Sequence, residues 1–139
     1  MLSFFRYFFG AAVLWILCWG IYSDNLRNGF LLDDEGLIVD KTAIHDLRNI
    51  PTIFKNAASN DFQVLGFYRP VSEAFRACLY SLFQKQPRLY HLTNILLFYF
   101  FCLLIFFLIK ILVNREKLAL LTTVLFCVHP LNSTPVCYI

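Results

Sequence analysis

Two long runs of apolar residues without a charged side chain dominate the chain. The first extends from Tyr7 to Ser23, and the second from Leu92 to Ile109. A membrane-spanning helix needs about twenty apolar residues, and the first run is lengthened by apolar residues that precede Arg6. The second run is apolar on every face, as expected of a helix in lipid. We therefore predict transmembrane helices over residues 1–23 and 91–113.

The first run has an alternative interpretation as a cleaved signal peptide. A signal peptide ends in a cleavage site made of small residues, whereas this run ends in the bulky residues Trp19 and Tyr22. Aromatic residues at that position are typical of the membrane interface. We therefore interpret the run as an uncleaved signal anchor.

A third apolar run begins at Leu118 and continues through His129-Pro130 to Ile139 without a charge. It predicts a third transmembrane helix over residues 118–139, joined to the second by a short cytoplasmic turn at residues 114–117. No polar segment closes this run. We therefore expect the third helix to be incomplete and the chain to be either a fragment or a natural short subunit.

The basic residues indicate an orientation in the membrane. Short segments rich in Lys and Arg remain in the cytoplasm, whereas long loops are translocated largely regardless of charge. Short basic segments precede the first span and follow the second, and they contain Arg6, Lys110, Arg115 and Lys117. We predict an integral protein of the inner membrane or endoplasmic reticulum, with a cytoplasmic N-terminus and with residues 24–90 in the periplasm or lumen.

The long outer loop contains amphipathic segments. Between Arg69-Pro70 and Pro87, apolar residues recur at helical spacing, and proline suits the first turn of a helix or ends one. A shorter segment, IPTIFKNA, begins at Ile50. Both predict helices that lie on the membrane surface. The expected fold is all-α, with two full transmembrane helices, a third incomplete one, and a long outer loop that contains amphipathic surface helices.

Composition supports a membrane location and narrows the chemistry. Apolar residues make up 59% of the chain, more than a small soluble domain can bury. The net charge of +3 is not gathered into a basic patch, so no nucleic-acid partner is expected. The cysteines form no CxxC pair or other metal-ligand spacing, and we interpret those within apolar runs as small buried hydrophobes; these are Cys18, Cys102 and Cys127.

An acidic triplet, Asp33-Asp34-Glu35, follows the first span. Consecutive carboxylates beside apolar residues suit a general base, or a cation site that faces a phosphorylated substrate. Considered alone, the triplet is more typical of a solvated acidic turn. Its place between an anchor helix and an amphipathic segment favours the functional interpretation.

Several short motifs occur in an order that resembles a known family. They are Phe30 to Ile38 (FLLDDEGLI), Ile50 with Ile53-Phe54, Tyr68-Arg69-Pro70, Tyr90-His91-Leu92 with Asn94, and Leu125-Phe126 with His129-Pro130-Leu131. Together they resemble the N-terminal part of membrane glycosyltransferases of the GT-C fold. The likeness is to the tetratricopeptide-bearing O-mannosyltransferase branch and its bacterial relatives, and it extends over nearly the whole chain.

The resemblance implies a reaction and a base. The donor is a sugar on a polyprenyl-phosphate carrier, the acceptor is a hydroxyl at the outer membrane face, and a carboxylate of the first outer loop activates that hydroxyl. Asp34 is the corresponding residue, with Asp33 and Glu35 as alternatives. A divalent cation at these carboxylates is compatible with the resemblance, although no residue is assigned as a metal ligand.

The resemblance also suggests groups that bind the substrates. Arg69 is a candidate for a contact with the donor phosphate, or alternatively for one with lipid headgroups. His91 and His129 lie near the outer ends of their predicted spans, so both are candidates for the same cleft. For His91 an interfacial position beside Tyr90 is the alternative, and for His129 the adjacent proline frees backbone carbonyls near the imidazole.

Two departures from the family pattern favour an altered or inactive copy. Relatives carry a histidine where this chain has Phe98, and an acidic residue where it has Thr134. The main alternative to an enzyme is a non-catalytic subunit that packs its Phe-rich helices against other membrane proteins. A transporter is less favoured, since the second span carries only Tyr99 and Cys102 as polar residues at its centre, where transport sites usually have broken helices. Expected partners are therefore membrane lipids, the lipid-linked donor and other membrane subunits.

Overall fold

The computed structural model describes residues 2–30, 34–55 and 69–138 of the chain. Within these ranges every regular element is a helix, so the predicted all-α fold class is confirmed. The chain divides into two compact units. The first, a helical bundle, contains Met1–Asn28 and His91–Ile139, and the second, the loop unit, contains Gly29–Tyr90.

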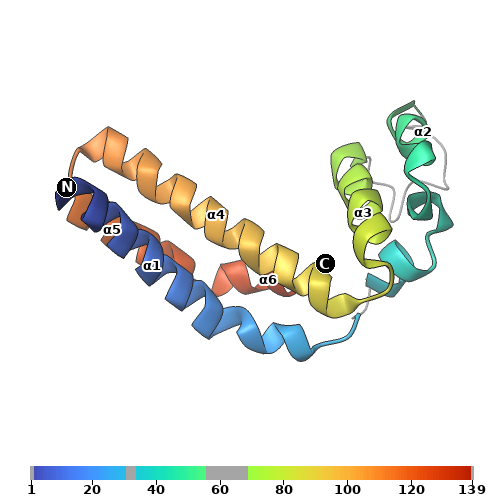
Figure 1. The fold of residues 1–139 in the computed structure, drawn as a ribbon, viewed down its shortest axis with the longest axis horizontal. Coiled ribbons are helices and arrows are strands. Elements are labelled where there is room, and N and C mark those ends of the chain that lie inside the picture. Colours follow the sequence, from blue (N-terminus) through green and yellow to red (C-terminus); the bar gives the residue numbers. More distant parts are fainter. Residues whose placement is uncertain (1, 31–33, 56–68, 139) are drawn as a thin grey trace. The chain divides into compact units, whose positions relative to one another are not determined.

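Two helices are long and apolar enough to cross a membrane, as predicted. Helix α1 covers Leu2–Tyr22 and continues into the short helix η1, Ser23–Arg27. Helix α4 covers Pro87–Val113. It begins at a proline because the first turn needs no amide donor at that position. Figure 1 shows α1 in blue and α4 in yellow and orange.

Ring contacts show that α1 and α4 run antiparallel. Residues late in α1 meet residues early in α4, and residues early in α1 meet residues late in α4. The centroid distances are 5.4 Å for Tyr22–Phe98, 5.1 Å for Trp15–Tyr99 and 6.3 Å for Tyr7–Phe107. The Lys110 ammonium lies 3.5 Å from the centroid of the Tyr7 ring. Both predicted spans therefore pack as a hairpin, with Lys110 beside the start of α1.

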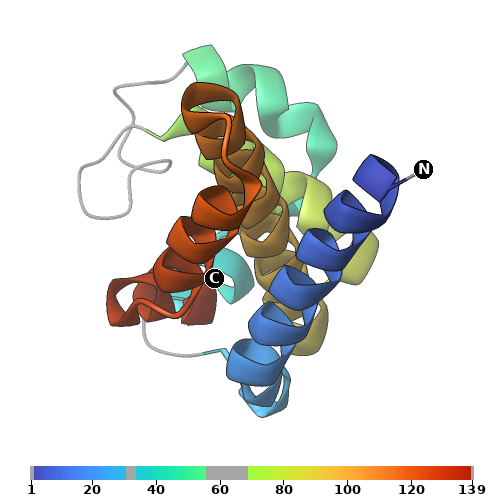
Figure 2. The same cartoon turned by 90° about the vertical axis from the view of Figure 1, so that its left-hand side faces the viewer.

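The third predicted span is divided in the structure. Helix α5 covers Glu116–Cys127, and after a break the short helices η6, Pro130–Asn132, and α6, Ser133–Cys137, follow at an angle of 59°. The break occurs because a proline disfavours helical backbone at the preceding residue, and His129 has an extended conformation. Helix α5 packs along α1 (Figures 1 and 2).

The core of the bundle is made where α1, α4 and α5 meet. Its buried apolar members include Leu14, Cys18, Tyr22, Ile95, Phe98, Cys102, Phe106, Ala119 and Cys127. Phe106 is 1% exposed, whereas Phe101 on the same helix is 52% exposed. Phe106 therefore packs inside this chain and is not available to a partner subunit, while Phe101 faces outward.

The loop unit is built from short helices around α3. In chain order these are η2, Glu35–Val39, η3, Thr42–His45, η4, Leu47–Asn49, α2, Ile50–Lys55, and α3, Pro70–Phe83. Helix α3 packs against η3, η4 and α2. The small core of the unit includes Ile38, Ile44, Ile53 and Ala77, all of which are buried.

Helix α3 begins at Pro70 and ends before Pro87, as the sequence predicts. Its packing face is formed by Glu73, Ala77 and Leu79. Of the apolar residues at helical spacing along this segment, Leu79 is buried, whereas Val71, Phe75 and Leu82 are exposed. An exposed apolar stripe suits a helix that lies on a membrane surface, and that location stays a prediction.

Candidate functional site

The acidic segment separates into a buried and an exposed carboxylate. Asp34 directly precedes η2 and is 1% exposed. Its side chain makes no capping hydrogen bond to the helix that it begins. Glu35 is exposed, and Asp33 lies outside the described residues. Of the two carboxylates of this triplet that the structure describes, Asp34 is therefore the buried one.

A buried ion network joins η3 to α3 in the loop unit. The Lys41 ammonium lies 2.9 Å from Oε2 of Glu73, and the two side chains are only 5% and 8% exposed. Arg76 donates a hydrogen bond of 2.9 Å to the other carboxylate oxygen, Oε1 of Glu73. Both oxygens of the Glu73 carboxylate thus have a cationic partner. Buried charges are stable only when they are paired in this way.

The network is absent from the sequence-based prediction. The spacing of Glu73 and Arg76 is that of a helical ion pair, which is a usable signal. Lys41 precedes η3, and only the folded chain brings it to Glu73. Hydrophobic periodicity along α3 does not predict that Glu73 is buried, because Glu73 is a charged residue among the buried residues of this helix.

A second contact attaches η3 to both of its neighbours. The His45 ring stacks on Tyr80 of α3 with a centroid distance of 3.9 Å and an interplanar angle of 10°. Its Nε2–H donates a hydrogen bond of 2.8 Å to the carbonyl of Ile38 in η2. Together with the ion network, this contact connects η2, at whose start Asp34 lies, through η3 to α3.

Arg69 occupies the position immediately before α3. Its side chain is exposed, and its carbonyl accepts a hydrogen bond of 3.1 Å from the amide of Glu73. Pro70 disfavours helical backbone at Arg69, and Arg69 has a non-helical conformation. Arg69 is therefore an exposed residue directly before the first turn of α3. Its predicted roles, a contact with a donor phosphate or with a lipid headgroup, stay predictions.

The histidines of the bundle lie in different environments. His91 is fully buried, and its Nδ1 lies 3.3 Å from the Asn25 amide nitrogen. The same amide reaches the carbonyls of Val136 and Cys137 at 3.3 and 3.4 Å. His91 thus belongs to a contact that joins η1, α4 and α6. A role for this imidazole in binding substrate stays a prediction.

His129 is exposed and acts locally on the backbone. Its Nδ1 accepts a hydrogen bond of 3.3 Å from the amide of Leu131, and the His129 side chain thereby caps the short helix η6. The predicted approach of His129 to the same cleft as His91 is not tested by these contacts.

The two positions that depart from the family pattern also differ from one another. Phe98 is 8% exposed, and its ring contacts those of Tyr22 and Phe126 at 5.4 and 6.1 Å. Phe98 therefore contributes to the bundle core, where a histidine would need a polar partner. Thr134 lies exposed in α6.

Comparison with known proteins gives a distant relationship. No protein-family model matches the chain, and no solved structure matches it. The chain is 28% identical over 119 residues to human protein O-mannosyl-transferase TMTC3, and 27% identical over 119 residues to the mouse protein of that name. Each match covers 83% of this chain, which spans about 13% of the length of these relatives. Most of the chain is thus similar to one part of much longer proteins that are named as O-mannosyl-transferases.

Proposed function

We propose that this chain is the N-terminal part of a membrane glycosyltransferase of the GT-C fold. The enzyme moves a sugar from a polyprenyl-phosphate carrier to an acceptor hydroxyl at the outer membrane face. The observation that carries the proposal is the similarity to the two O-mannosyl-transferases over 83% of the chain. The confirmed helical fold with two potential spans supports it, since a lipid-linked donor must be met at a membrane.

The proposed base is Asp34. In this reaction its carboxylate takes the proton of the acceptor hydroxyl as that oxygen bonds to the anomeric carbon of the donor sugar. The bond from that carbon to the phosphate oxygen breaks, and the polyprenyl phosphate leaves as an anion. A base is useful here because a hydroxyl is a weak nucleophile. The burial of Asp34 at the start of η2 supports this role, because its carboxylate is shielded from water.

Arg69 is the proposed contact for the donor phosphate. Its planar guanidinium can donate two parallel hydrogen bonds to phosphate oxygens, and so stabilise the charge that develops on the leaving group. The exposed side chain before α3 supports this role because an incoming donor can reach it. A divalent cation near the exposed Glu35 is a further proposed aid to the same charge.

The test is to replace Asp34 by Asn in the membrane-embedded enzyme and to measure sugar transfer from a polyprenyl-phosphate donor. General base catalysis contributes a factor of about 10²–10⁴, so transfer should fall at least about 100-fold. Asp40→Asn is the matched control, since Asp40 is exposed in the same unit, and it should retain transfer. Transfer at the wild-type rate in Asp34→Asn would show that Asp34 is not the base.

The alternative, a non-catalytic subunit in a larger membrane complex, makes a different prediction. The exposed apolar residues of α4 are expected in both cases, because lipid or a partner helix would cover them. If the chain is such a subunit, Phe101→Ser should release a partner complex, since Phe101 faces outward. For the enzyme, the same change should leave sugar transfer intact while Asp34→Asn removes it.

A further inference from the structure

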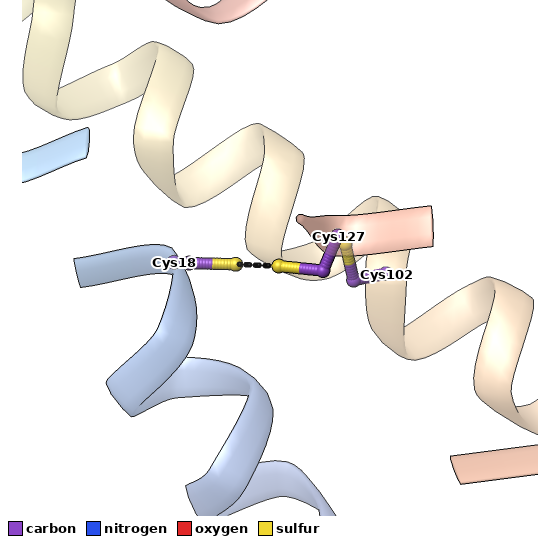
Figure 3. Close-up of side chains that lie close together, drawn as sticks. All are labelled: Cys18, Cys102 and Cys127. Carbon is purple, nitrogen blue, oxygen red and sulfur yellow. Dashed lines mark hydrogen bonds between the residues drawn. The ribbon is translucent and has the colours of Figure 1, made fainter. Parts of the chain in front are cut away.

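Three cysteine side chains meet in the interior of the helical bundle. Cys18 comes from α1, Cys102 from α4, and Cys127 is the last residue of α5 (Figure 3). Their Sγ atoms all lie within 4.8 Å of one another, and those of Cys18 and Cys127 are 3.5 Å apart. Each side chain is completely buried. Three of the five cysteines of the chain thus converge on one point from three different helices.

The separation of the sulfurs suits a shared metal ion. A metal at the centre of three sulfurs, with bonds of about 2.3 Å, places the sulfurs about 4.0 Å apart. The Cys18–Cys127 separation of 3.5 Å and the upper limit of 4.8 Å for all three pairs lie on either side of this value. Ion binding therefore requires only small changes of side-chain rotamer. A disulfide would need two sulfurs at about 2.05 Å and would leave the third without a role.

We propose that Cys18, Cys102 and Cys127 form a binding site for Cu(I). Thiol ligands favour soft cations such as Cu(I). Structural zinc instead takes four ligands in a tetrahedron, and among the described residues this cluster offers three His, Cys, Asp or Glu ligands. A three-sulfur set with no fourth protein ligand matches the low coordination number of Cu(I).

The proposed Cu(I) complex contains two thiolates and one neutral thiol. Two S–H bonds break and release two protons to solvent, two thiolate–copper bonds form, and the third sulfur binds as a neutral thiol. The complex carries a net charge of −1, and copper stays in the same oxidation state. A third deprotonation would bury a charge of −2 in an apolar core, which is strongly unfavourable. Binding should therefore release two protons per ion and weaken as the pH falls.

The position of the site predicts slow exchange of the ion. The ion would connect α1, α4 and α5 at the level where α5 ends and the chain bends. Because all three thiols are buried, the ion can enter or leave only when these helices separate. Bound Cu(I) should accordingly raise the melting temperature of the bundle and should resist removal by a chelator.

The test uses the reduced full chain in micelles, titrated with Cu(I) against a competing Cu(I) chelator. We expect one ion per chain, a thiolate-to-copper charge-transfer band, and three sulfur neighbours in X-ray absorption. Loss of a group that hydrogen-bonds to a metal ligand lowers metal affinity about 10- to 100-fold. Cys102→Ala removes a ligand itself, so it should lower the affinity for Cu(I) by more than about 100-fold. The control Cys78→Ala removes an exposed cysteine outside the cluster and should bind as the wild type does.

Several results would overturn the proposal. These are wild-type affinity in the triple alanine variant of the cluster, no copper binding by the wild type, and a disulfide between two cluster cysteines in the freshly isolated chain. If Cys102→Ala loses helicity in circular dichroism, Cys18→Ala and Cys127→Ala replace it in the comparison. A rise in melting temperature with Cu(I) in the wild type and in Cys78→Ala, but not in the cluster variants, would support the site independently.

Discussion

Replacing Lys41 by Met should destabilise the loop unit without affecting the helical bundle. The change keeps an apolar stem but removes the ammonium that lies 2.9 Å from Oε2 of Glu73. At an effective dielectric constant of about 20, charges at this distance attract by roughly 6 kcal/mol before desolvation is counted. Measured losses on breaking a buried pair are about 3–5 kcal/mol. Because Arg76 still pairs with Glu73, we expect a loss near the lower limit, about 3 kcal/mol.

The assay is amide hydrogen exchange of the chain in lipid nanodiscs. A loss of about 3 kcal/mol in the free energy of local opening should accelerate exchange of the α3 amides about 150-fold. Amides in the middle of α4 should exchange as in the wild type, because they belong to the bundle. The matched control is Arg27→Met, which removes an ion pair of 4.0 Å whose side chains are 85% and 93% exposed, and should leave exchange unchanged.

The triple variant Lys41→Met/Glu73→Leu/Arg76→Met separates the charge from other effects. It removes all three charges of the network, and such replacements are often neutral or stabilising, so protection of α3 should return to near the wild-type level. The reasoning is refuted if Lys41→Met leaves exchange of α3 unchanged. It is equally refuted if the triple variant is no better protected than Lys41→Met, since the loss would then come from packing.

Further predictions concern the bundle and the orientation of the chain. Phe106→Ala should lower the unfolding free energy in micelles by about 3–5 kcal/mol, whereas Phe101→Ala, at a position 52% exposed, should change it far less; equal effects would contradict the described core. Asn25→Ala should accelerate amide exchange in α6, because the Asn25 amide donates to the carbonyls of two residues of that helix; unchanged exchange would show that the contact is weak. In a variant that keeps Cys78 as its sole cysteine, an impermeant maleimide should label Cys78 in intact cells or in sealed, correctly oriented vesicles. A sole cysteine introduced as Asn114→Cys should react only after permeabilisation. The reverse pattern would contradict the predicted orientation.

The elements that could be predicted from the sequence have local signals. Both spans follow from uninterrupted apolar runs, and α3 follows from Pro70, Pro87 and the apolar spacing between them. The bend after α5 also has a local signal in Pro130, since proline disfavours helical backbone at the residue before it. The predicted third span thus consists of α5 and a bent pair of short helices, and the structure allows it as one broken span.

The buried clusters could not be predicted in the same way. Lys41 meets Glu73, and the thiols of Cys18, Cys102 and Cys127 converge, only when separate helices pack. Their sequence positions follow no periodicity or ligand spacing. The sequence alone therefore predicts buried packing residues at these cysteines, and the structure confirms their burial and shows their proximity.

The two units bury different kinds of polar group, and this difference yields a decisive comparison. The buried polar residues described in the bundle carry amide, imidazole and hydroxyl groups, namely Asn25, His91 and Thr123. Those described in the loop unit are Asp34, Lys41 and Glu73. Lys41 and Glu73 stabilise one another, so removing either charge should lower stability. If Asp34 is present for catalysis, Asp34→Asn should instead remove sugar transfer while α3 keeps its wild-type protection from exchange, because functional charges are often retained at the expense of stability. A loss of protection as large as that of Lys41→Met would assign Asp34 to the fold and leave the base unidentified.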